Sequence, residues 1–149
     1  MMHTEATLPV SWRAKPRSFV ALMGLYESNY LRLLRLCGDP AALPTLRQAL
    51  VEGDCPLQLT VAARTPYTTE LDLTYLMPDT DERLPDLRVK LYADARMAEA
   101  LSCANQPLHP ALRALHLATA AEQFDQRWRL NVLLNKWLEY LLDRGYRLG

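Results

Sequence analysis

Three stretches between residues 57 and 103 alternate apolar and polar side chains, and this pattern constrains the fold more than any other feature. Residues 57–64, 70–75 and 87–94 carry an apolar residue at every second position, with mostly charged or hydroxyl side chains between them. A period of two places alternate side chains on opposite faces of a β-strand. The three runs therefore predict a sheet with one buried face and one polar face.

Helical patterns lie on both sides of this central part. Apolar residues recur at intervals of three and four from Ser18, a good N-cap residue, to Cys37, and Gly38 follows as a stop signal. A second amphipathic helix is predicted from about Ala120 to Arg144. It ends at a glycine, which tolerates the left-handed conformation common after a helix.

The connections between the strands predict antiparallel neighbours. Residues 65–68 form a connection short enough for a hairpin, and a second reversal near Asp94 and Ala95 returns the chain through residues 97–103. Residues 41–56 contain breakers, and within them 46–51 could form a short helix. Residues 104–121 could form a helical turn or two.

These elements predict a two-layer α+β fold. Two amphipathic helices are the available cover for the apolar face of a sheet. We expect an antiparallel meander of three or four strands, covered on one face by the N-terminal and C-terminal helices. We also expect residues 1–16 to be a flexible arm and residues 17–149 to form a single domain.

Composition limits the classes of partner and cofactor. Lys and Arg together number 17, as do Asp and Glu, so no net charge attracts nucleic acid or an anionic membrane. The three cysteines are widely spaced without a CxxC pair, and His109 and His116 lack a third ligand at metal spacing. We expect no metal, no cofactor and no membrane partner. Without a signal-peptide pattern or a membrane span, the expected location is the cytoplasm.

The polar face of the predicted sheet offers two interpretations. Parity permits Arg64 opposite Glu70, and Asp72 opposite Lys90 with Glu70 near Tyr92, which would make a solvated face of paired charges. The alternative is a site for a small anionic ligand such as a phosphorylated metabolite or nucleotide, since arginine can bond two oxygens at once. The candidate ligand-binding residues are Arg64, Tyr67, Arg88, Lys90, Tyr92, Asp94 and Glu99, with Arg96 as a further cation.

The direction of Glu99 depends on the turn that precedes it. A two-residue turn at Asp94 and Ala95 places Ala98 and Ala100 in the core and Glu99 opposite Lys90. A three-residue turn shifts the register by one and points Glu99 inward. An inward carboxylate would be costly unless paired, and the outward direction is the safer expectation.

Two polar positions stand out on the last helix. Asp125 and Asn131 lie among apolar residues, and Asn131 lies seven residues before Leu138 on the apolar stripe. A buried, hydrogen-bonded amide that fixes the helix position outweighs a ligand contact as the interpretation of Asn131.

Several stretches together resemble one known family. Residues 87–95, LRVKLYADA, with Ala98 and Glu99 after them, resemble the "VRLYHDA…AEV" signature of the YqiB-like family. Further agreement lies in residues 27–30 with Leu33, in residues 67–69, and in residues 137–145. Ala93 replaces the histidine of that signature, and the segment 109–127 keeps only Asp125 and Arg127 of the usual pattern.

The resemblance implies a small bacterial cytoplasmic protein and no particular activity. Our leading hypothesis is a non-catalytic interaction module that binds another protein or a second copy of itself through a helix face or a sheet edge. The alternative is a small-ligand protein or enzyme that uses the Arg, Tyr and Asp residues of the sheet. RNA binding is a third, weaker hypothesis.

Overall fold

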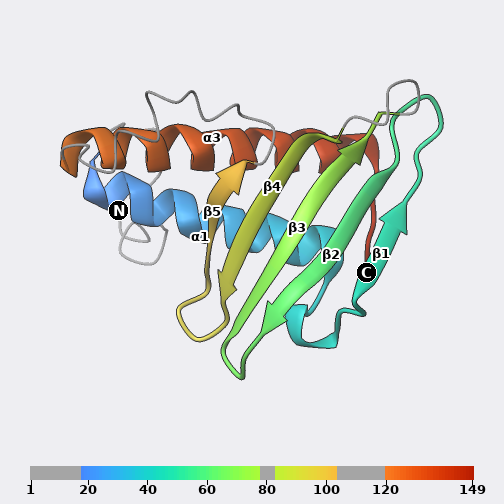
Figure 1. Cartoon of the computed structure of the whole chain (residues 1–149), viewed down its shortest axis with the longest axis horizontal. Coiled ribbons are helices and arrows are strands. Elements are labelled where there is room, and N and C mark those ends of the chain that lie inside the picture. Colours follow the sequence, from blue (N-terminus) through green and yellow to red (C-terminus); the bar gives the residue numbers. More distant parts are fainter. Residues whose placement is uncertain (1–17, 78–82, 104–119) are drawn as a thin grey trace, which may run out of the picture.

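The computed structural model describes residues 18–77, 83–103 and 120–149, which fold into a sheet and two long helices (Figure 1). The expected arm at residues 1–16 and the expected helical turns at 104–119 lie outside the described residues. The elements are α1 (Phe19–Cys37), the 3-10 turn η2 (Pro40–Ala42), β1 (Leu46–Ala49), β2 (Leu57–Arg64), β3 (Thr68–Leu76), β4 (Arg83–Tyr92), β5 (Met97–Cys103) and α3 (Ala120–Arg144).

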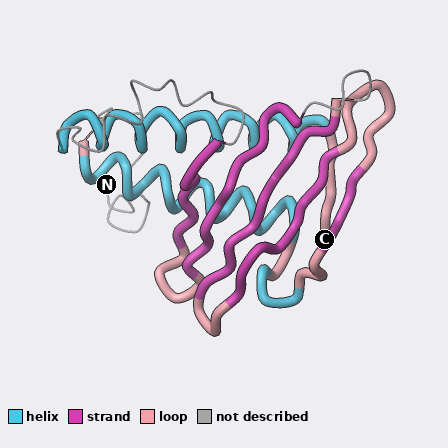
Figure 2. Tube along the Cα trace, in the orientation of Figure 1, coloured by secondary structure: helices cyan, strands magenta, loops and turns pink. Residues whose placement is uncertain are grey.

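The strands form an antiparallel meander in the order β1-β2-β3-β4-β5, which Figure 2 shows as one continuous twisted sheet. The expectation of three or four strands is corrected to five. The additional strand, β1, lies where a short helix over residues 46–51 was left open. Its backbone pairs with β2, with Leu46 opposite Thr60 and Ala49 opposite Leu57. A helix of that length would leave most of its backbone groups unpaired, whereas a strand next to β2 satisfies half of them.

The apolar face of the sheet packs against both helices in one core, which confirms the two-layer α+β class. In Figure 1 the helices run across the strands on the same side of the sheet. Their inward leucines interleave with the alternating residues of β2, β3 and β4. The fully buried leucines of this core are Leu33, Leu36, Leu57, Leu59, Leu71, Leu73, Leu87, Leu91, Leu134, Leu138 and Leu141.

The N-terminal halves of the two helices extend past β5 and pack on each other there (Figure 1). Ala21, Leu22, Leu25 and Tyr26 of α1 meet Trp128 of α3 in a second apolar cluster. The parts of the helices that project beyond β5 therefore bury their apolar side chains against each other.

Local signals set the helix ends as predicted. The Ser18 hydroxyl accepts a hydrogen bond from the N–H of Ala21 at 3.0 Å, and Gly38 adopts a positive φ of 72° while its N–H bonds to the carbonyl of Leu34. Gly145 after α3 also has a positive φ, of 90°. These conformations are costly for other residues, which is why glycine marks both ends.

The stability of the fold should depend on the central leucines of the sheet. We expect Leu73→Ala to lower the free energy of unfolding by about 2–5 kcal/mol, because it leaves a cavity at a fully buried position. The matched control is Leu31→Ala on the exposed side of α1, which should change stability by less than about 0.5 kcal/mol. Urea unfolding followed by circular dichroism measures both. Equal effects of the two changes would contradict the packing described here.

Candidate functional site

The charges on the polar face of the sheet are paired, but with other partners than the sequence suggested. Arg88 lies opposite Asp72 and bonds it twice, with Nε 2.5 Å from Oδ1 and Nη2 3.0 Å from Oδ2. Lys90 lies opposite Glu70. The predicted pairing of Asp72 with Lys90, and of Glu70 with Tyr92, was therefore wrong by two residues. Alternation specifies only which face a side chain occupies, so a slip of two residues leaves it unchanged.

The Asp72 carboxylate occupies the guanidinium fork of Arg88. The hydrogen bond from Arg88 to Asp72 raises the pKa of Arg88 above its usual value, against the smaller opposing effect of burial. A bidentate contact uses the donors that an arginine would otherwise offer to a phosphate. On this face Arg88 therefore neutralises the charge of Asp72 on the neighbouring strand β3.

Glu99 lies on the polar side of β5, opposite Lys90, as a two-residue turn would have placed it. The turn has four residues, Ala93–Arg96, and an even number keeps the same parity, so Ala98 and Ala100 are buried in the core. The Tyr92 hydroxyl donates a hydrogen bond to Glu99 Oε1 at 2.5 Å. Glu99 is thus both cross-strand paired and hydrogen-bonded.

A second tyrosine approaches Glu99 from α1. Burial first, and then the negative charge of Glu99, raises the pKa of Tyr26 to about 12. The pKa of Tyr92 is also raised, by burial and by its hydrogen bond to Glu99. Both hydroxyls therefore stay protonated at neutral pH and act as donors toward the carboxylate.

Arg64 points to the helix side of the sheet because β2 contains a bulge. The register shifts between Val61 and Ala63, so that Ala63 lies opposite Glu70 and Arg64 lies opposite Thr69, which is buried. The prediction of Arg64 opposite Glu70 was wrong for this reason: one extra residue reverses the facing of all later side chains.

The guanidinium of Arg64 is used to hold the segment after α1. Its Nη2 donates to the carbonyl of Leu43 at 2.7 Å and to that of Pro40 at 3.3 Å. Arg64 and Tyr67 line a hollow of only about 60 Å³, together with Tyr30 and Asp39. That volume holds little more than one or two water molecules.

The candidate ligand residues therefore divide into separate groups. Arg64 and Tyr67 line the hollow, and Arg88, Lys90, Tyr92 and Glu99 lie on the polar face of β4 and β5. Asp94 lies exposed in the turn between those strands, where its Oδ1 accepts the N–H of Ala95 at 2.9 Å. The structure does not bring these side chains together around one cavity.

Asn131 closes the outer edge of the sheet at β5. Its Oδ1 accepts the backbone N–H of Ala100 at 2.7 Å, and its Nδ2 donates to the carbonyl of the same residue at 3.4 Å. Asn131 is fully buried. Its side-chain amide thus takes the place that the backbone of a further strand would occupy. This agrees with the predicted role of a buried amide that fixes the helix position.

Two further asparagines extend this contact to α1. Asn29 Nδ2 donates to Asn131 Oδ1 at 3.4 Å, and Asn135 Nδ2 donates to Asn29 Oδ1 at 2.9 Å. Sequence reasoning missed both residues, although Asn135 lies one helical turn after Asn131 and so shares its face. Asp125 lies half-buried on a different side of α3, six residues before Asn131.

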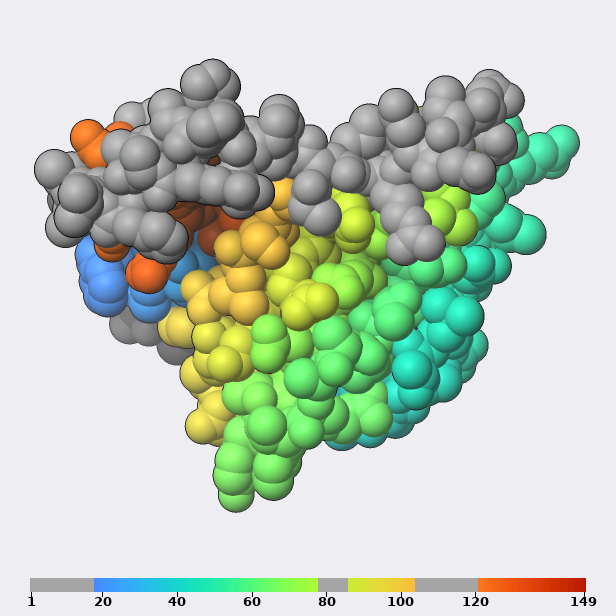
Figure 3. Space-filling view, in the orientation of Figure 1, coloured from blue at the N-terminus to red at the C-terminus, as the bar shows by residue number. Residues whose placement is uncertain are grey.

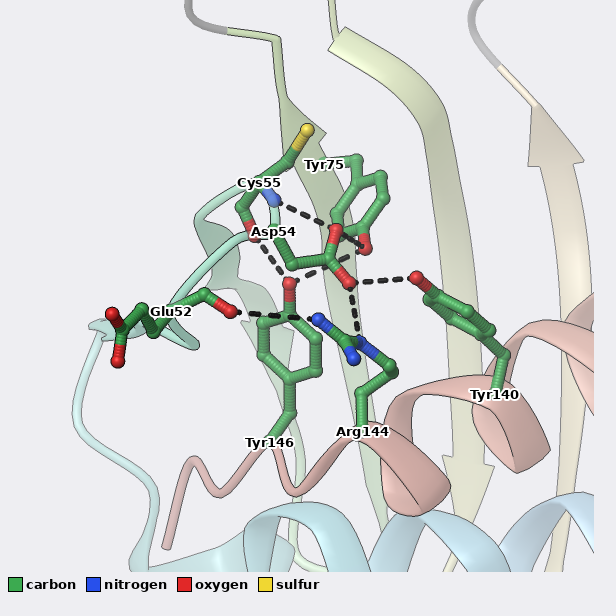
Figure 4. A network of polar contacts seen from close by, with 7 residues as sticks. All are labelled: Glu52, Asp54, Cys55, Tyr75, Tyr140, Arg144 and Tyr146. Carbon is green, nitrogen blue, oxygen red and sulfur yellow. Dashed lines mark hydrogen bonds and ion pairs between the residues drawn. The ribbon is translucent and has the colours of Figure 1, made fainter.

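A cluster of polar contacts around Asp54 anchors the loop after β1 (Figure 4). Asp54 Oδ1 accepts the Tyr75 hydroxyl at 2.5 Å and the N–H of Cys55 at 2.7 Å. Asp54 Oδ2 accepts the Tyr140 hydroxyl at 2.6 Å and Nε of Arg144 at 3.0 Å. The loop between β1 and β2 is therefore tied to β3 and to the last turns of α3.

The same contacts set the ionisation of Asp54. Burial by itself would raise the pKa of this carboxyl group, but hydrogen bonds from Tyr140, Tyr75, the Cys55 N–H and Arg144 together hold it well below its usual value. Tyr146 adds a bond from its hydroxyl to the Cys55 carbonyl at 2.5 Å. Sequence reasoning treated Asp54 only as a loop residue. Its side-chain partners Tyr75, Tyr140 and Arg144 lie at least 21 positions away, so no local signal could have found them.

The outer edge of β1, unlike that of β5, is open among the described residues. The N–H of Val61 donates to the carbonyl of Thr45, so the odd-numbered residues of β1 bond to β2. In an antiparallel pair the intervening residues direct their backbone groups away from that partner. Leu46 and Gln48 therefore present free N–H and C=O groups at the edge. Leu46 is 54% exposed, and Leu50, just after the strand, is 77% exposed.

These features define a two-layer α+β protein in which α3 bonds one edge of the sheet through Asn131, while the other edge is open among the described residues. Residues 32–147 match the family described as "Protein of unknown function (DUF1249)", and the chain belongs to that family. The resemblance seen in the sequence is thereby confirmed.

Curated relatives agree with this assignment. The chain is 30% identical over 128 residues to "Uncharacterized protein YqiB" of Escherichia coli strain K12, covering 85% of this chain and 90% of the relative. The same values hold for the proteins of that name from strains CFT073 and O157:H7. No solved structure matches the chain.

Two features of the described residues concern membranes and metals. Neither α1 nor α3 has the length and apolar content that a membrane-crossing helix requires. Within residues 18–77, 83–103 and 120–149, no three His, Cys, Asp or Glu side chains are grouped as metal ligands.

Removing the amide of Asn131 should destabilise the fold. We expect Asn131→Ala to lower the free energy of unfolding by about 1–3 kcal/mol, because the buried backbone groups of Ala100 lose their partner. Gln126→Ala, at an exposed position of the same helix, is the control and should be nearly neutral. Urea unfolding of both variants measures the difference. A neutral Asn131→Ala variant would contradict the capping role.

The Asp54 cluster should make stability depend on pH in the acid range. Because the folded state lowers the pKa of Asp54, its contribution is complete above the unfolded pKa of about 3.9 and is lost as the pH falls toward the folded value. We expect Asp54→Asn to be less stable than wild type at pH 7, and this difference to shrink below about pH 4. Urea unfolding from pH 2.5 to 7 measures it. The exposed Asp143→Asn is the control, and a difference that stays constant to pH 2.5 would refute the assignment.

Proposed function

We propose that this protein is a non-catalytic interaction module of the bacterial cytoplasm that accepts an extended chain segment along the outer edge of β1. The observation that carries this proposal is the edge of β1, which is open among the described residues. Leu46 and Gln48 have free backbone groups there, and the side chains of Leu46 and Leu50 are exposed. An added strand would receive main-chain hydrogen bonds from the edge and apolar contacts from Leu46 and Leu50. This is strand addition, a common mode of peptide recognition.

The different treatment of the two edges supports a role for β1. An open edge is a hazard for aggregation, and proteins usually cover or blunt it. Here Asn131 bonds the outward-facing backbone of Ala100 on β5, whereas β1 is short, open among the described residues, and carries Leu46 on its polar-face side. Leu46 and Leu50, which are 54% and 77% exposed, are well placed for contact with another chain.

The Asp54 cluster supports the proposal by holding the edge in shape. Asp54 lies four residues after Leu50 and joins their shared loop to Tyr75, Tyr140 and Arg144. A loop that is ordered before binding loses less conformational entropy when the partner arrives. β1 and Leu50 are therefore held in an ordered conformation before a partner binds.

The alternative function is binding of a small anionic ligand, and its candidate residues stay a prediction. The contacts on the polar face weigh against it, because Asp72 occupies Arg88 and backbone carbonyls occupy Arg64. A thermal-shift screen with phosphorylated metabolites and nucleotides tests it, since a ligand that binds the folded state raises the melting temperature.

Lysine substitutions at the β1 edge should weaken binding without unfolding the protein. We expect Leu46→Lys with Leu50→Lys to weaken association with other chains, further copies included, at least tenfold, while the melting temperature stays unchanged because both leucines are exposed. The measurement is affinity capture with the full chain, followed by binding of each purified associate and by hydrogen exchange of the bound complex. The Leu46 and Gln48 N–H groups should become protected.

The matched control places the same two charges elsewhere. Leu101→Lys with Leu133→Lys alters exposed leucines of β5 and α3 and should leave association intact. Equal binding by both double variants, or a complex in which the β1 amides exchange as fast as before, would exclude strand addition at this edge.

A further inference from the structure

We infer that the segment added to β1 is β1 of a second copy of this chain, arranged antiparallel about a two-fold axis at Gln48. The inference rests on the proposed function and names its partner. Its basis is the symmetry of the edge itself: Leu46 and Leu50 lie two residues before and two residues after Gln48. In this register Leu46 of each copy lies opposite Leu50 of the other, so both exposed leucines gain an apolar cross-strand partner.

The backbone pattern fits this register. Leu46 and Gln48 both turn their N–H and C=O groups away from β2, because Thr45 bonds to Val61 and the pattern alternates along the strand. Pairing Gln48 with its own copy brings outward-facing residues together, and pairing Leu46 with Leu50 of the other copy extends this alternation one residue beyond β1. A two-fold axis perpendicular to the sheet also keeps the polar faces of both copies on the same side.

Charge distinguishes this register from its neighbour. Arg47 is the charged residue of β1, and it is exposed. A shift by two residues, with Leu46 opposite Gln48 of the second copy, would place the two Arg47 residues directly opposite each other. Like charges in that position are destabilising. In the register centred on Gln48, Arg47 faces the small Ala49 of the second copy instead.

The capped edge explains why assembly would stop at two copies. Pairing through β1 uses the same surface on both chains, which closes the assembly as a dimer with a continuous ten-stranded sheet. Its two outer edges are then the β5 strands, where Asn131 already occupies the backbone of Ala100. In Figure 3 the β1 segment forms the margin of the visible face.

Disulfide trapping tests the register directly. In a Cys55→Ser, Cys103→Ser background, Gln48→Cys should form a covalent dimer on mild oxidation, because directly paired Cα atoms lie about 5.5 Å apart. Leu46→Cys alone should not, since the two copies of residue 46 are about 13 Å apart along the strands. Mixing Leu46→Cys with Leu50→Cys chains should restore the cross-link. Non-reducing electrophoresis reads all three results.

Sedimentation of the unmodified full chain supplies the second measurement. We expect a concentration-dependent dimer that the Leu46→Lys, Leu50→Lys variant converts to a monomer. A chain that is monomeric at all concentrations and forms no Gln48→Cys cross-link overturns the inference. So does a dimer that persists in the lysine variant. If the chain is monomeric but another protein protects the β1 amides from exchange, only the second copy is excluded and strand addition stands.

Discussion

Burial of one leucine-rich face of the sheet under α1 and α3 is the constraint on which the rest of this structure depends. Alternate apolar residues of β2, β3 and β4, such as Leu57, Leu73 and Val89, make up that layer, and the helices supply the facing leucines. Because α1 and α3 both cover the apolar face, neither helix shields the opposite, polar face from water. Its charges are accordingly paired across strands, as Asp72 and Arg88 show. A surface neutralised in this way offers little to an anionic ligand.

The two edges of the sheet differ in whether their outward backbone groups are hydrogen-bonded. At β5, the position of α3 brings Asn131 against Ala100, and the three buried asparagines connect that edge to α1. Each hydrogen bond between asparagines of the two helices requires the helices in one relative position, so the network also limits how they can slide. At β1 the backbone is left open, while Asp54 and its partners hold the following loop. The contrast between a capped edge and an open one directs attention to β1 as the interaction surface.

Several parts of this arrangement followed from the sequence because their causes are local. Ser18 and Gly38 bound α1, and Gly145 ends α3, through backbone conformation and capping within a few residues. Alternation identified β2, β3 and β4 with their core side chains, and the predicted reversal near Asp94 identified β5. The outward position of Glu99 was open between two turns, and the four-residue turn decided it through parity.

Other parts could not follow from local patterns. Strand register was missed because a shift of two residues preserves the buried face. The direction of Arg64 was missed because the bulge near Val61 has no distinct signal in the run 57–64. β1 was missed because its four residues have no strong period of their own and gain stability only from β2.

The sequence alone determined the class of fold, the two helices with their ends, and which face of the sheet is apolar. Each of these depends on residue spacing and on short-range conformational preference. Only the tertiary structure decided which charges meet, which edge is closed, and that Asp54 gathers tyrosines from β3 and α3. Those outcomes depend on contacts between residues 16 to 106 positions apart. These contacts contribute free energy only when the whole core has assembled, so no short segment of the sequence predicts them.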